Sequence, residues 1–326
     1  MSDLGFYGET ICAIGVFDGM HLGHQYLLKR AREQADEMGL PLLVVTFDCD
    51  PDELFFPDRK HRKLLSDSER LYRLKCEDNG SARGISQETN SFESSETDRI
   101  VLALHFDHDL ASLTPVDFLN RVVASHCIPR GIHVGIDFRF GAGAQGNVEV
   151  LRQWAATHNA QAHGHHLFDD GGRPVSATRI RNCLEDTKLA EANRLLTRPH
   201  HLRGRIVKGR GFGREMGFPT ANIAVLDGIM PPADGVYAGF FEIGGDLQSA
   251  AISVGVPLTF EGLEASLEVY VLDFDDDLYE KEANIYFVEH LRPMIAFPGV
   301  PELMDQIGKD VMKTREVTTH ARELFN

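Results

Sequence analysis

The first half of the chain alternates between short apolar runs and longer stretches in which apolar residues recur every three or four positions. Residues 10–17 ("TICAIGVF") predict a buried strand, residues 21–39 a helix that ends at a glycine, and residues 41–47 ("PLLVVTF") a second strand. A strand, a helix and a strand of this length form a βαβ unit with parallel strands. The same pattern predicts further strands at 100–106 and 132–134 and further helices at 115–126 and 148–158. We therefore expect an α/β domain with a parallel sheet flanked by helices.

After Arg198 the pattern changes to short β-like segments separated by glycine and proline. These segments are "LRGRIV" at 202–207, "GVYAGFFEI" at 235–243, "LQSAAISVGV" at 247–256, "SLEVYVLDF" at 266–274 and "EANIYFV" at 282–288. Short strands at this spacing predict an antiparallel barrel or sandwich, followed by a terminal helix over 301–325. We place the domain boundary near residue 198, which gives domains 1–197 and 198–326. Residues 79–98 are polar and predict a solvated insertion loop in the first domain.

Composition and charge narrow the classes of protein and partner. The chain has 326 residues, of which 43% are hydrophobic and 25% charged, and a formal net charge of −16. No apolar run approaches the roughly 20 residues of a membrane helix. The acidic N-terminus lacks the features of a signal peptide, and the five scattered cysteines form no C-x-x-C pair, so we expect a cytoplasmic protein. The negative charge disfavours nucleic acid and anionic membranes as partners, whereas the pattern leaves self-association open.

Positive charge is nevertheless concentrated in two segments. One segment contains Arg203, Arg205, Lys208, Arg210 and Arg214, and the other contains Arg173, Arg179 and Arg181. A solvated basic face is one interpretation of each segment, and a site for a small anionic ligand is the other.

Two histidines, His21 and His24, stand where the first helix is predicted to begin. A metal site would need further ligands that no nearby cysteine or carboxylate cluster supplies, whereas a structural histidine pair remains open. The third interpretation is phosphate chemistry, because a helix N-terminus offers free backbone N–H groups and a partial positive charge. Gly15, Gly19 and Gly23 would then let the ligand approach, and no G-K-[ST] follows to make a Walker A loop.

A second phosphate-binding pattern lies in the basic, glycine-rich stretch "KGRGFGREMGFPTAN" at 208–222. Its glycines would let backbone amides wrap a phosphate chain, and the oxygens of Thr220 and Asn222 could bind Mg²⁺. A β-hairpin with glycine turns is the alternative. In the segment "SLEVYVLDF", alternation places Glu268 on the face opposite Leu267 and Val269, where a carboxylate must be either exposed or used.

Several motifs carry a resemblance to a known family. The stretch "GVFDGMHLGH" at 15–24 resembles the H-x-G-H signature of the nucleotidyltransferase superfamily in its bacterial FAD synthetase form. The stretch "VGIDFRFG" at 134–141 is similar to the flavin-side loop of that family, and "VSATRIRNCL" at 175–184 to its triphosphate segment. The stretch "GFPTAN" at 217–222 resembles the riboflavin kinase signature. Most of the chain thus resembles the bifunctional bacterial riboflavin kinase/FMN adenylyltransferases.

The resemblance implies a Rossmann-like nucleotidyltransferase domain followed by a riboflavin kinase barrel with a terminal helix. ATP in the first domain would be bound by Gly15, Phe17, Asp18, Gly19, His21, His24, Ser176, Thr178 and Arg179, and the flavin by Asp137, Phe138 and Arg139. Of these, His21, His24 and Arg179 would be catalytic. ATP in the second domain would be bound by Lys208, Gly209, Arg210, Gly211, Gly213, Thr220 and Asn222, of which Thr220 and Asn222 would also hold Mg²⁺. Glu268 would be the general base there, and Arg292 would contact the flavin.

The implied reactions convert riboflavin to FMN and then FMN to FAD, each with ATP. The chain departs from the family pattern at Cys49, Asp50, Ala142, Ala144, Pro257, Leu258 and Met294. Two alternatives therefore stay open. One is a riboflavin kinase with an impaired first domain, and the other is a regulator that binds flavin or nucleotide without turnover.

Overall fold

The computed structural model describes residues 5–57, 62–76, 99–166, 168–208, 213, 217–226, 228–255, 266–274 and 279–325. Unit 1 contains the described residues up to Ser176 except Arg62–Ser66, and unit 2 contains Arg62–Ser66 and the described residues from Ala177 onward. The predicted insertion at 79–98 lies outside the described residues. The predicted domain boundary near residue 198 stays a prediction, and the contacts of residues 177–197 group them with unit 2.

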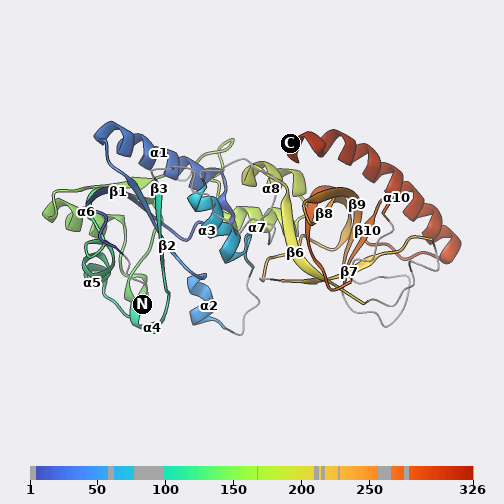
Figure 1. Cartoon of the computed structure of the whole chain (residues 1–326), viewed down its shortest axis with the longest axis horizontal. Coiled ribbons are helices and arrows are strands. Elements are labelled where there is room, and N and C mark those ends of the chain that lie inside the picture. Colours follow the sequence, from blue (N-terminus) through green and yellow to red (C-terminus); the bar gives the residue numbers. More distant parts are fainter. Residues whose placement is uncertain are drawn as a thin grey trace. The chain divides into compact units, whose positions relative to one another are not determined.

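Unit 1 is built on a five-stranded sheet in the order β3-β2-β1-β4-β5 (Figure 1). The strands are β1 (Glu9–Ile14), β2 (Leu42–Phe47), β3 (Arg99–Leu104), β4 (Ile128–Gly135) and β5 (Gln161–His165). All neighbouring pairs are parallel, which confirms the predicted sheet. The strand order reverses between β1 and β4, and open parallel sheets bind ligands at such a point, outside the carboxyl ends of the strands.

Helices cover this sheet and explain the long apolar runs of β1 and β2, since a parallel sheet is buried on both faces. The described helices are α1 (Leu22–Met38), α2 (Pro51–Phe55), α3 (Asp67–Lys75), α4 (His108–Ala111), α5 (Pro115–Phe118) and α6 (Val148–Thr157). Shorter helical turns are η1 (Asp18–Met20), η3 (Leu119–Val123) and η4 (Ala142–Ala144). Helix α1 packs against β1 and β4, α3 against β3, and α6 against β5.

The first strand and helix differ slightly from their predicted bounds. Strand β1 ends at Ile14 instead of residue 17, because Phe17 has a left-handed backbone (φ 60°) that a strand cannot hold. Helix α1 begins at Leu22, and His21 is its N-cap. Strand β5 was not predicted, since its sequence "QAHGH" shows no apolar alternation.

Unit 2 contains a closed barrel in the order β10-β7-β6-β11-β8-β9, which decides between the two predicted β architectures. Its strands are β6 (His200–Val207), β7 (Ala221–Val225), β8 (Gly235–Ile243), β9 (Asp246–Gly255), β10 (Ser266–Val271) and β11 (Glu282–Arg292). All pairs are antiparallel, as predicted. Strand β7 was not predicted, because it follows directly on the glycine-rich stretch.

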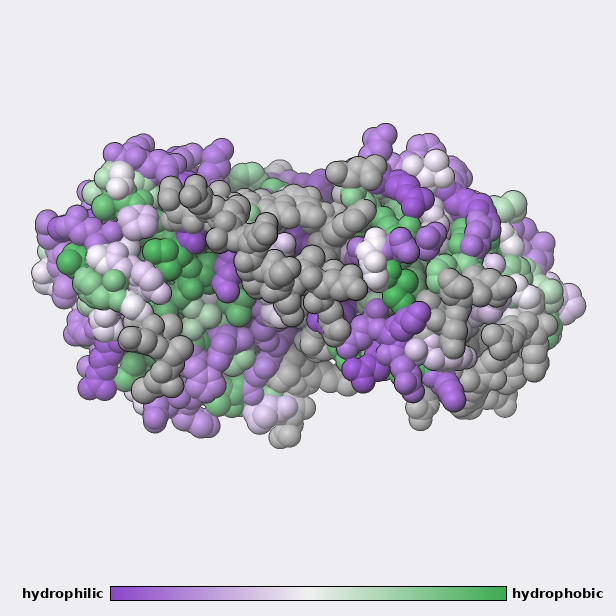
Figure 2. Space-filling model, viewed as in Figure 1, coloured by the Kyte–Doolittle hydropathy of each residue, from purple (hydrophilic) through white to green (hydrophobic). Residues whose placement is uncertain are grey.

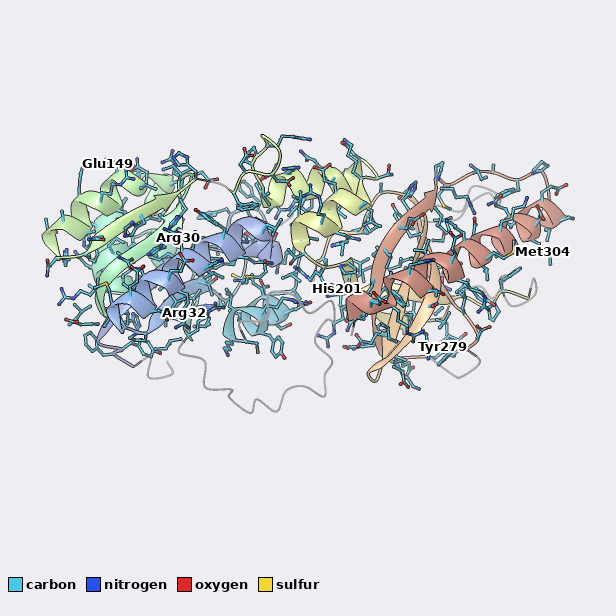
Figure 3. All side chains as sticks on the ribbon, turned by 90° about the horizontal axis from the view of Figure 1, so that it is seen from above. Arg30, Arg32, Glu149, His201, Tyr279 and Met304 are labelled. Atoms are coloured by element: carbon cyan, nitrogen blue, oxygen red, sulfur yellow. The ribbon has the colours of Figure 1, made fainter. Side chains whose placement is uncertain are left out.

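Helices accompany the barrel within unit 2. They are α7 (Ala177–Glu185), α8 (Leu189–Leu196) and α10 (Val300–Ala321), with a final helical turn η5 (Arg322–Phe325). Helix α10 confirms the predicted terminal helix and packs against β8, β9 and β11, lying along the barrel as Figure 3 shows. The ring of Phe325 lies 4.7 Å from that of Phe240 and 4.9 Å from that of Tyr286.

Hydrophilic and apolar residues are interspersed on the face drawn in Figure 2. Among the described residues, no helix combines the length and the apolar character needed to cross a membrane.

Candidate active sites

The loop between β1 and α1 has a strained backbone. Phe17 (φ 60°) and Met20 (φ 44°) both adopt the left-handed region that bulky side chains rarely enter. Such residues persist only where the surroundings hold them, and they cluster at functional sites. The Phe17 ring is buried against Gly15, where an added Cβ would lie 3.2 Å from the ring. The surrounding structure therefore holds the backbone of this loop in a conformation of high local energy, as is common at functional sites.

His21 caps the N-terminus of α1 and is 3% exposed. Its Nδ1 accepts hydrogen bonds from the backbone N–H groups of Gly23 (3.2 Å) and His24 (3.4 Å). A ring nitrogen that accepts hydrogen bonds carries no proton, so the neutral ring carries its proton on Nε2. The helix cap thus makes Nε2 the donor of this imidazole.

His24 stacks on His21, with ring centroids 3.7 Å apart and planes 16° from parallel. The edge of Phe17 meets it at 5.3 Å. Burial holds the pKa of His24 well below its usual range, and the nearby His21 and Arg70 lower it further. Its Nδ1 is buried and has no hydrogen-bond partner among the described residues. Because a buried polar atom without a partner is costly, this nitrogen is suited to receive a ligand.

Gly23 has a packing role that differs from the predicted one. A Cβ at Gly23 would lie 3.1 Å from the His21 ring and 3.2 Å from the carbonyl oxygen of Val175. The glycine therefore gives room to the protein's own chain, which reaches the start of α1 at Val175. Ser176, a predicted phosphate ligand, directly follows Val175 in the sequence.

Thr178 and Arg179, the other predicted phosphate ligands of this segment, belong to unit 2. Ser176 is half-buried and lies just before α7, whereas Thr178 is exposed and lies in the first turn of α7. Arg179 is 10% exposed, and its Nη2 lies 2.6 Å from Oε1 of Glu191 on α8. Glu191 was not predicted, and it fixes the orientation of the guanidinium.

The predicted flavin-side residues lie in the turn after β4, the strand next to β1. Asp137 and Arg139 are exposed, while Phe138 is half-buried and stacks on Phe140 with ring centroids 5.3 Å apart. Phe138 N–H donates to the carbonyl of Gly135 at 3.0 Å, which closes the turn. Adjacent parallel strands place this turn and the loop after β1 at the same edge of the sheet.

Arg70 on α3 is a buried residue that sequence reasoning missed. It is 2% exposed, and its Nη1 donates to the carbonyl of Val16 (2.9 Å) and to Oγ1 of Thr46 (2.8 Å). Its Nη2 donates to the carbonyl of Phe47 (2.9 Å) and to Asp67 (3.0 Å). Its charge thus lies next to the loop that leads to the imidazole pair.

Strands β4 and β5 also carry a cluster of histidines. His133 Nδ1 lies 2.8 Å from His165 Nε2, and His133 Nε2 lies 2.7 Å from the amide oxygen of Gln34 on α1. The ring of His163 lies 4.7 Å from that of His133. Burial lowers the pKa of His133 to about 3. No group of metal-ligand side chains able to hold an ion was found in the part of the chain that the structure describes.

Cys49 follows β2 and lies beside Asp48, whose carboxylate accepts from the backbone N–H of Phe106 at 3.1 Å. Burial raises the pKa of the Cys49 thiol to about 11, and the Asp48 carboxylate adds to the effect. The thiol therefore stays protonated near neutral pH and is a poor nucleophile.

In unit 2 the structure brings together the predicted base and the predicted magnesium ligands. Glu268 on β10 is directly opposite Asn222 on β7, so both side chains lie on one face of the sheet. The hydroxyl of Thr220 donates to Oε2 of Glu268 at 3.2 Å. On the same strand Leu267 and Val269 are buried and Glu268 is half-buried, in agreement with the predicted alternation.

The glycine-rich loop is described only in part. Lys208 is exposed, and Gly209, Arg210 and Gly211 lie outside the described residues. At Gly213 an added Cβ would overlap with the carbonyl oxygen of Phe218 and lie 3.2 Å from Oγ1 of Thr220. The glycine at 213 thus lets the loop close directly over the threonine.

Arg292, the predicted flavin ligand of the barrel, is held by α10. Its Nε and Nη2 donate to the carboxylate of Asp310, with Nη2 2.8 Å from Oδ2. The guanidinium also lies 5.7 Å from the centre of the Phe297 ring. This contact fastens the end of β11 to α10, and the predicted flavin contact stays a prediction.

Known protein families match both units. A family model described as FAD synthetase matches residues 6–80 and 83–179, and one described as Riboflavin kinase matches residues 196–318. The bifunctional riboflavin kinase/FMN adenylyltransferase of Escherichia coli K12 is 32% identical over 308 residues, covering 94% of this chain and 92% of that one. The protein of the same name from Listeria monocytogenes is 32% identical over 316 residues, with 94% and 92% covered.

A solved structure is similar over the same length. It is called a macrolide-efflux protein, from Streptococcus pneumoniae, and matches with a TM-score of 0.79 and 32% identity over 96% of both chains. The similarity therefore includes both the parallel sheet and the barrel.

Proposed function

We propose a residue-level mechanism for this chain, which belongs to the family of bifunctional riboflavin kinase/FMN adenylyltransferases. The region matched as riboflavin kinase phosphorylates riboflavin to FMN with ATP. The region matched as FAD synthetase transfers an adenylyl group from a second ATP to FMN, which forms FAD and releases pyrophosphate. The two matched regions thus catalyse successive reactions of one route.

For adenylyl transfer, the phosphate of FMN attacks the α-phosphorus of ATP. His21 donates from Nε2 to a phosphate oxygen, and neutral His24 lies against it as a second contact to the developing charge. Donors held in place before reaction stabilise such charge without reorganising. Ser176, Thr178 and Arg179 bind the leaving phosphates, and Asp137, Phe138 and Arg139 contact the flavin. The observation that carries this half is the stacked imidazole pair at the helix N-terminus, in which the buried Nδ1 of His24 has no hydrogen-bond partner among the described residues.

For riboflavin phosphorylation, Glu268 accepts the proton of the ribityl 5′-hydroxyl as its oxygen attacks the γ-phosphoryl group. The loop from Lys208 to Gly213 and Thr220 positions ATP, and Arg292 contacts the flavin edge. Positioning of this kind supplies most of the catalysis in phosphoryl transfer. The observation that carries this half is the hydrogen bond of 3.2 Å from Thr220 to Glu268.

The oxygens around Glu268 suit Mg²⁺. A hydroxyl, a carboxylate and an amide from Thr220, Glu268 and Asn222 share one face of neighbouring strands, and oxygen ligands are those that Mg²⁺ prefers. Thr220 and Asn222 would hold the ion. When bound with ATP, Mg²⁺ neutralises charge on the phosphate oxygens.

The test follows the flavins by chromatography. The full chain is incubated with riboflavin and Mg-ATP, and FMN and FAD are both expected. Accumulation of FMN alone would support the reading with an impaired first domain, and unchanged riboflavin would support a non-catalytic regulator.

A variant separates the two reactions. His21→Ala is expected to form FMN normally and to form FAD about 10²–10³ times more slowly, as for loss of one charge-stabilising donor. His158→Ala is the matched control, because its ring also stacks in unit 1, on Trp154 at 3.9 Å, away from the helix cap. Normal FAD formation by His21→Ala would contradict the assignment.

A further inference from the structure

We propose that Arg70 is a positioning residue for adenylyl transfer. Its guanidinium ties the loop after β1 to the carboxyl end of β2 and so sets the place of the His21–His24 pair. The inference rests on the proposed function of unit 1, and it names a residue of α3 that belongs to none of the motifs described above.

Arg70 joins backbone atoms of two separate segments. Nη1 binds the carbonyl of Val16, the residue just before the left-handed Phe17, and Nη2 binds the carbonyl of Phe47, the last residue of β2. The hydroxyl of Thr46 links the same two residues, because it accepts a hydrogen bond from Arg70 and donates one to the carbonyl of Val16 at 3.4 Å. One planar fork therefore spans the ends of two adjacent strands.

The backbone at Phe17, which follows Val16, is strained. A buried Phe at φ 60° costs on the order of 1–3 kcal/mol and needs surroundings that dictate it. The carbonyl of Val16 is the atom through which the neighbouring structure holds this peptide. Because Phe17 packs edge-on against His24, a shift of Val16 would move the imidazole pair. Arg70 thus acts on the site through the loop and not through the substrate.

The charge of Arg70 also acts on the site. Among the described residues, the carboxylate that binds the Arg70 guanidinium is that of Asp67, which is partly exposed. The charged and titratable groups on the elements around the start of α1 include Asp18 in η1, His21 in the cap, and Asp67 and Arg70 in α3. Burial is the main reason that the pKa of His24 is lowered, and the nearby cation of Arg70 adds to this effect by disfavouring a second positive charge. Arg70 therefore positions the loop and also helps to keep His24 neutral.

The test compares Arg70 with a neighbour that is equally buried. Arg73 lies on the same helix, is 4% exposed and pairs with Glu69 on that helix at 2.7 Å. The variants are Arg70→Met, Arg70→Lys, Arg73→Met and Arg73→Lys, all in the full chain. For each we measure the melting temperature, kcat and KM for FAD formation from FMN and ATP, and FMN formation from riboflavin.

Arg70→Met is expected to lower kcat for FAD formation about 10- to 100-fold, with FMN formation unchanged. Arg70→Lys keeps the charge but not the planar fork, so it should lose part of the rate. The Arg73 variants should lose stability without this loss of kcat in the folded protein. Should Arg70→Met not fold, Arg70→Lys decides: wild-type kcat in Arg70→Lys would overturn the proposal.

A readout independent of activity is the NMR titration of His24. Removal of the charge in Arg70→Met should raise the pKa of His24, whereas Arg70→Lys and both Arg73 variants should leave its titration unchanged. A purely structural role for Arg70 predicts no such difference. An unshifted titration in folded Arg70→Met, or equal losses of kcat in the Arg70 and Arg73 variants, would overturn the proposal. If the wild-type chain made no FAD, the function proposed for unit 1 would fail, and the titration would still test the placement of Arg70.

Discussion

Glu268→Gln is the substitution that best tests the chemistry of the barrel. The glutamine has nearly the shape of glutamate and keeps an oxygen that can accept from Thr220, whose hydroxyl lies 3.2 Å from Oε2 in the structure. The backbone pairs of β10 with β7 and β9 are untouched. What is lost is the ability to take a proton from the substrate hydroxyl.

The expected loss follows from that single role. A positioned general base contributes about 10²–10⁴ in rate, which corresponds to about 3–5 kcal/mol of activation free energy. The kcat for riboflavin phosphorylation should fall by this factor. FAD formation from supplied FMN should be unchanged, because Glu268 is not among the residues proposed for adenylyl transfer.

The matched control is Glu242→Gln in the same barrel. Glu242 is 5% exposed, and its Oε2 accepts from Asn284 (3.1 Å) and from the hydroxyl of Tyr286 (2.6 Å). Loss of charge there should destabilise the barrel by about 1–3 kcal/mol without changing kcat of the folded protein. A folded Glu268→Gln variant that phosphorylates riboflavin at the wild-type rate would refute the assignment of the base.

Two further changes test the glycine loop and the histidine cluster. Gly213→Ala should slow riboflavin phosphorylation about 100-fold, because the new Cβ overlaps with the carbonyl of Phe218 and displaces Thr220; equal FMN formation by this variant and wild type would contradict it. Acid should destabilise unit 1, because unfolded His133 takes up a proton below its ordinary pKa of 6.5 while the folded pKa is about 3. The contribution of neutral His133 to stability should therefore be fully present above pH 6.5 and be lost as the pH falls from 6.5 to 3. Over this range the melting temperature of His133→Gln should fall less steeply than that of wild type. Identical pH dependence in the two proteins would count against the cluster.

The sequence pattern predicted correctly those residue environments that depend only on the strand or helix to which the residue belongs. Strand β8 was predicted with its observed bounds, and the alternation around Glu268 correctly put Leu267 and Val269 on the opposite face, where both are buried. Period-two alternation is a local property, so it survives without knowledge of the neighbours. The parallel sheet was readable for the same reason, from the strand, helix and strand of residues 10–47.

Contacts between elements that are far apart in the sequence could not be predicted from the local pattern. Arg70 lies in the charged stretch "DSERLYRLK", which has the composition of an exposed helix, and only the ends of β1 and β2 reveal why it is buried. The recurrence of arginine at 70 and 73 beside the buried Leu74 was the available signal. His133 has a partner on β5, and Arg292 has one on α10, so neither environment could be inferred from the local sequence. The roles of the individual site residues remain predictions that the variants above can test.

The left-handed backbone at Phe17 and Met20 has a consequence for any laboratory selection of heat-resistant forms of this chain. Glycine at either position would relieve about 1–3 kcal/mol of backbone strain, but it would also remove a buried side chain, because Phe17 is 1% and Met20 is 2% exposed. Loss of a large buried side chain costs about 2–5 kcal/mol. A screen that rewards only thermostability should therefore keep both side chains and gain its stability elsewhere in the chain. Retention of Phe17 and Met20 in the selected clones would show that packing against His24 outweighs the strain of this loop.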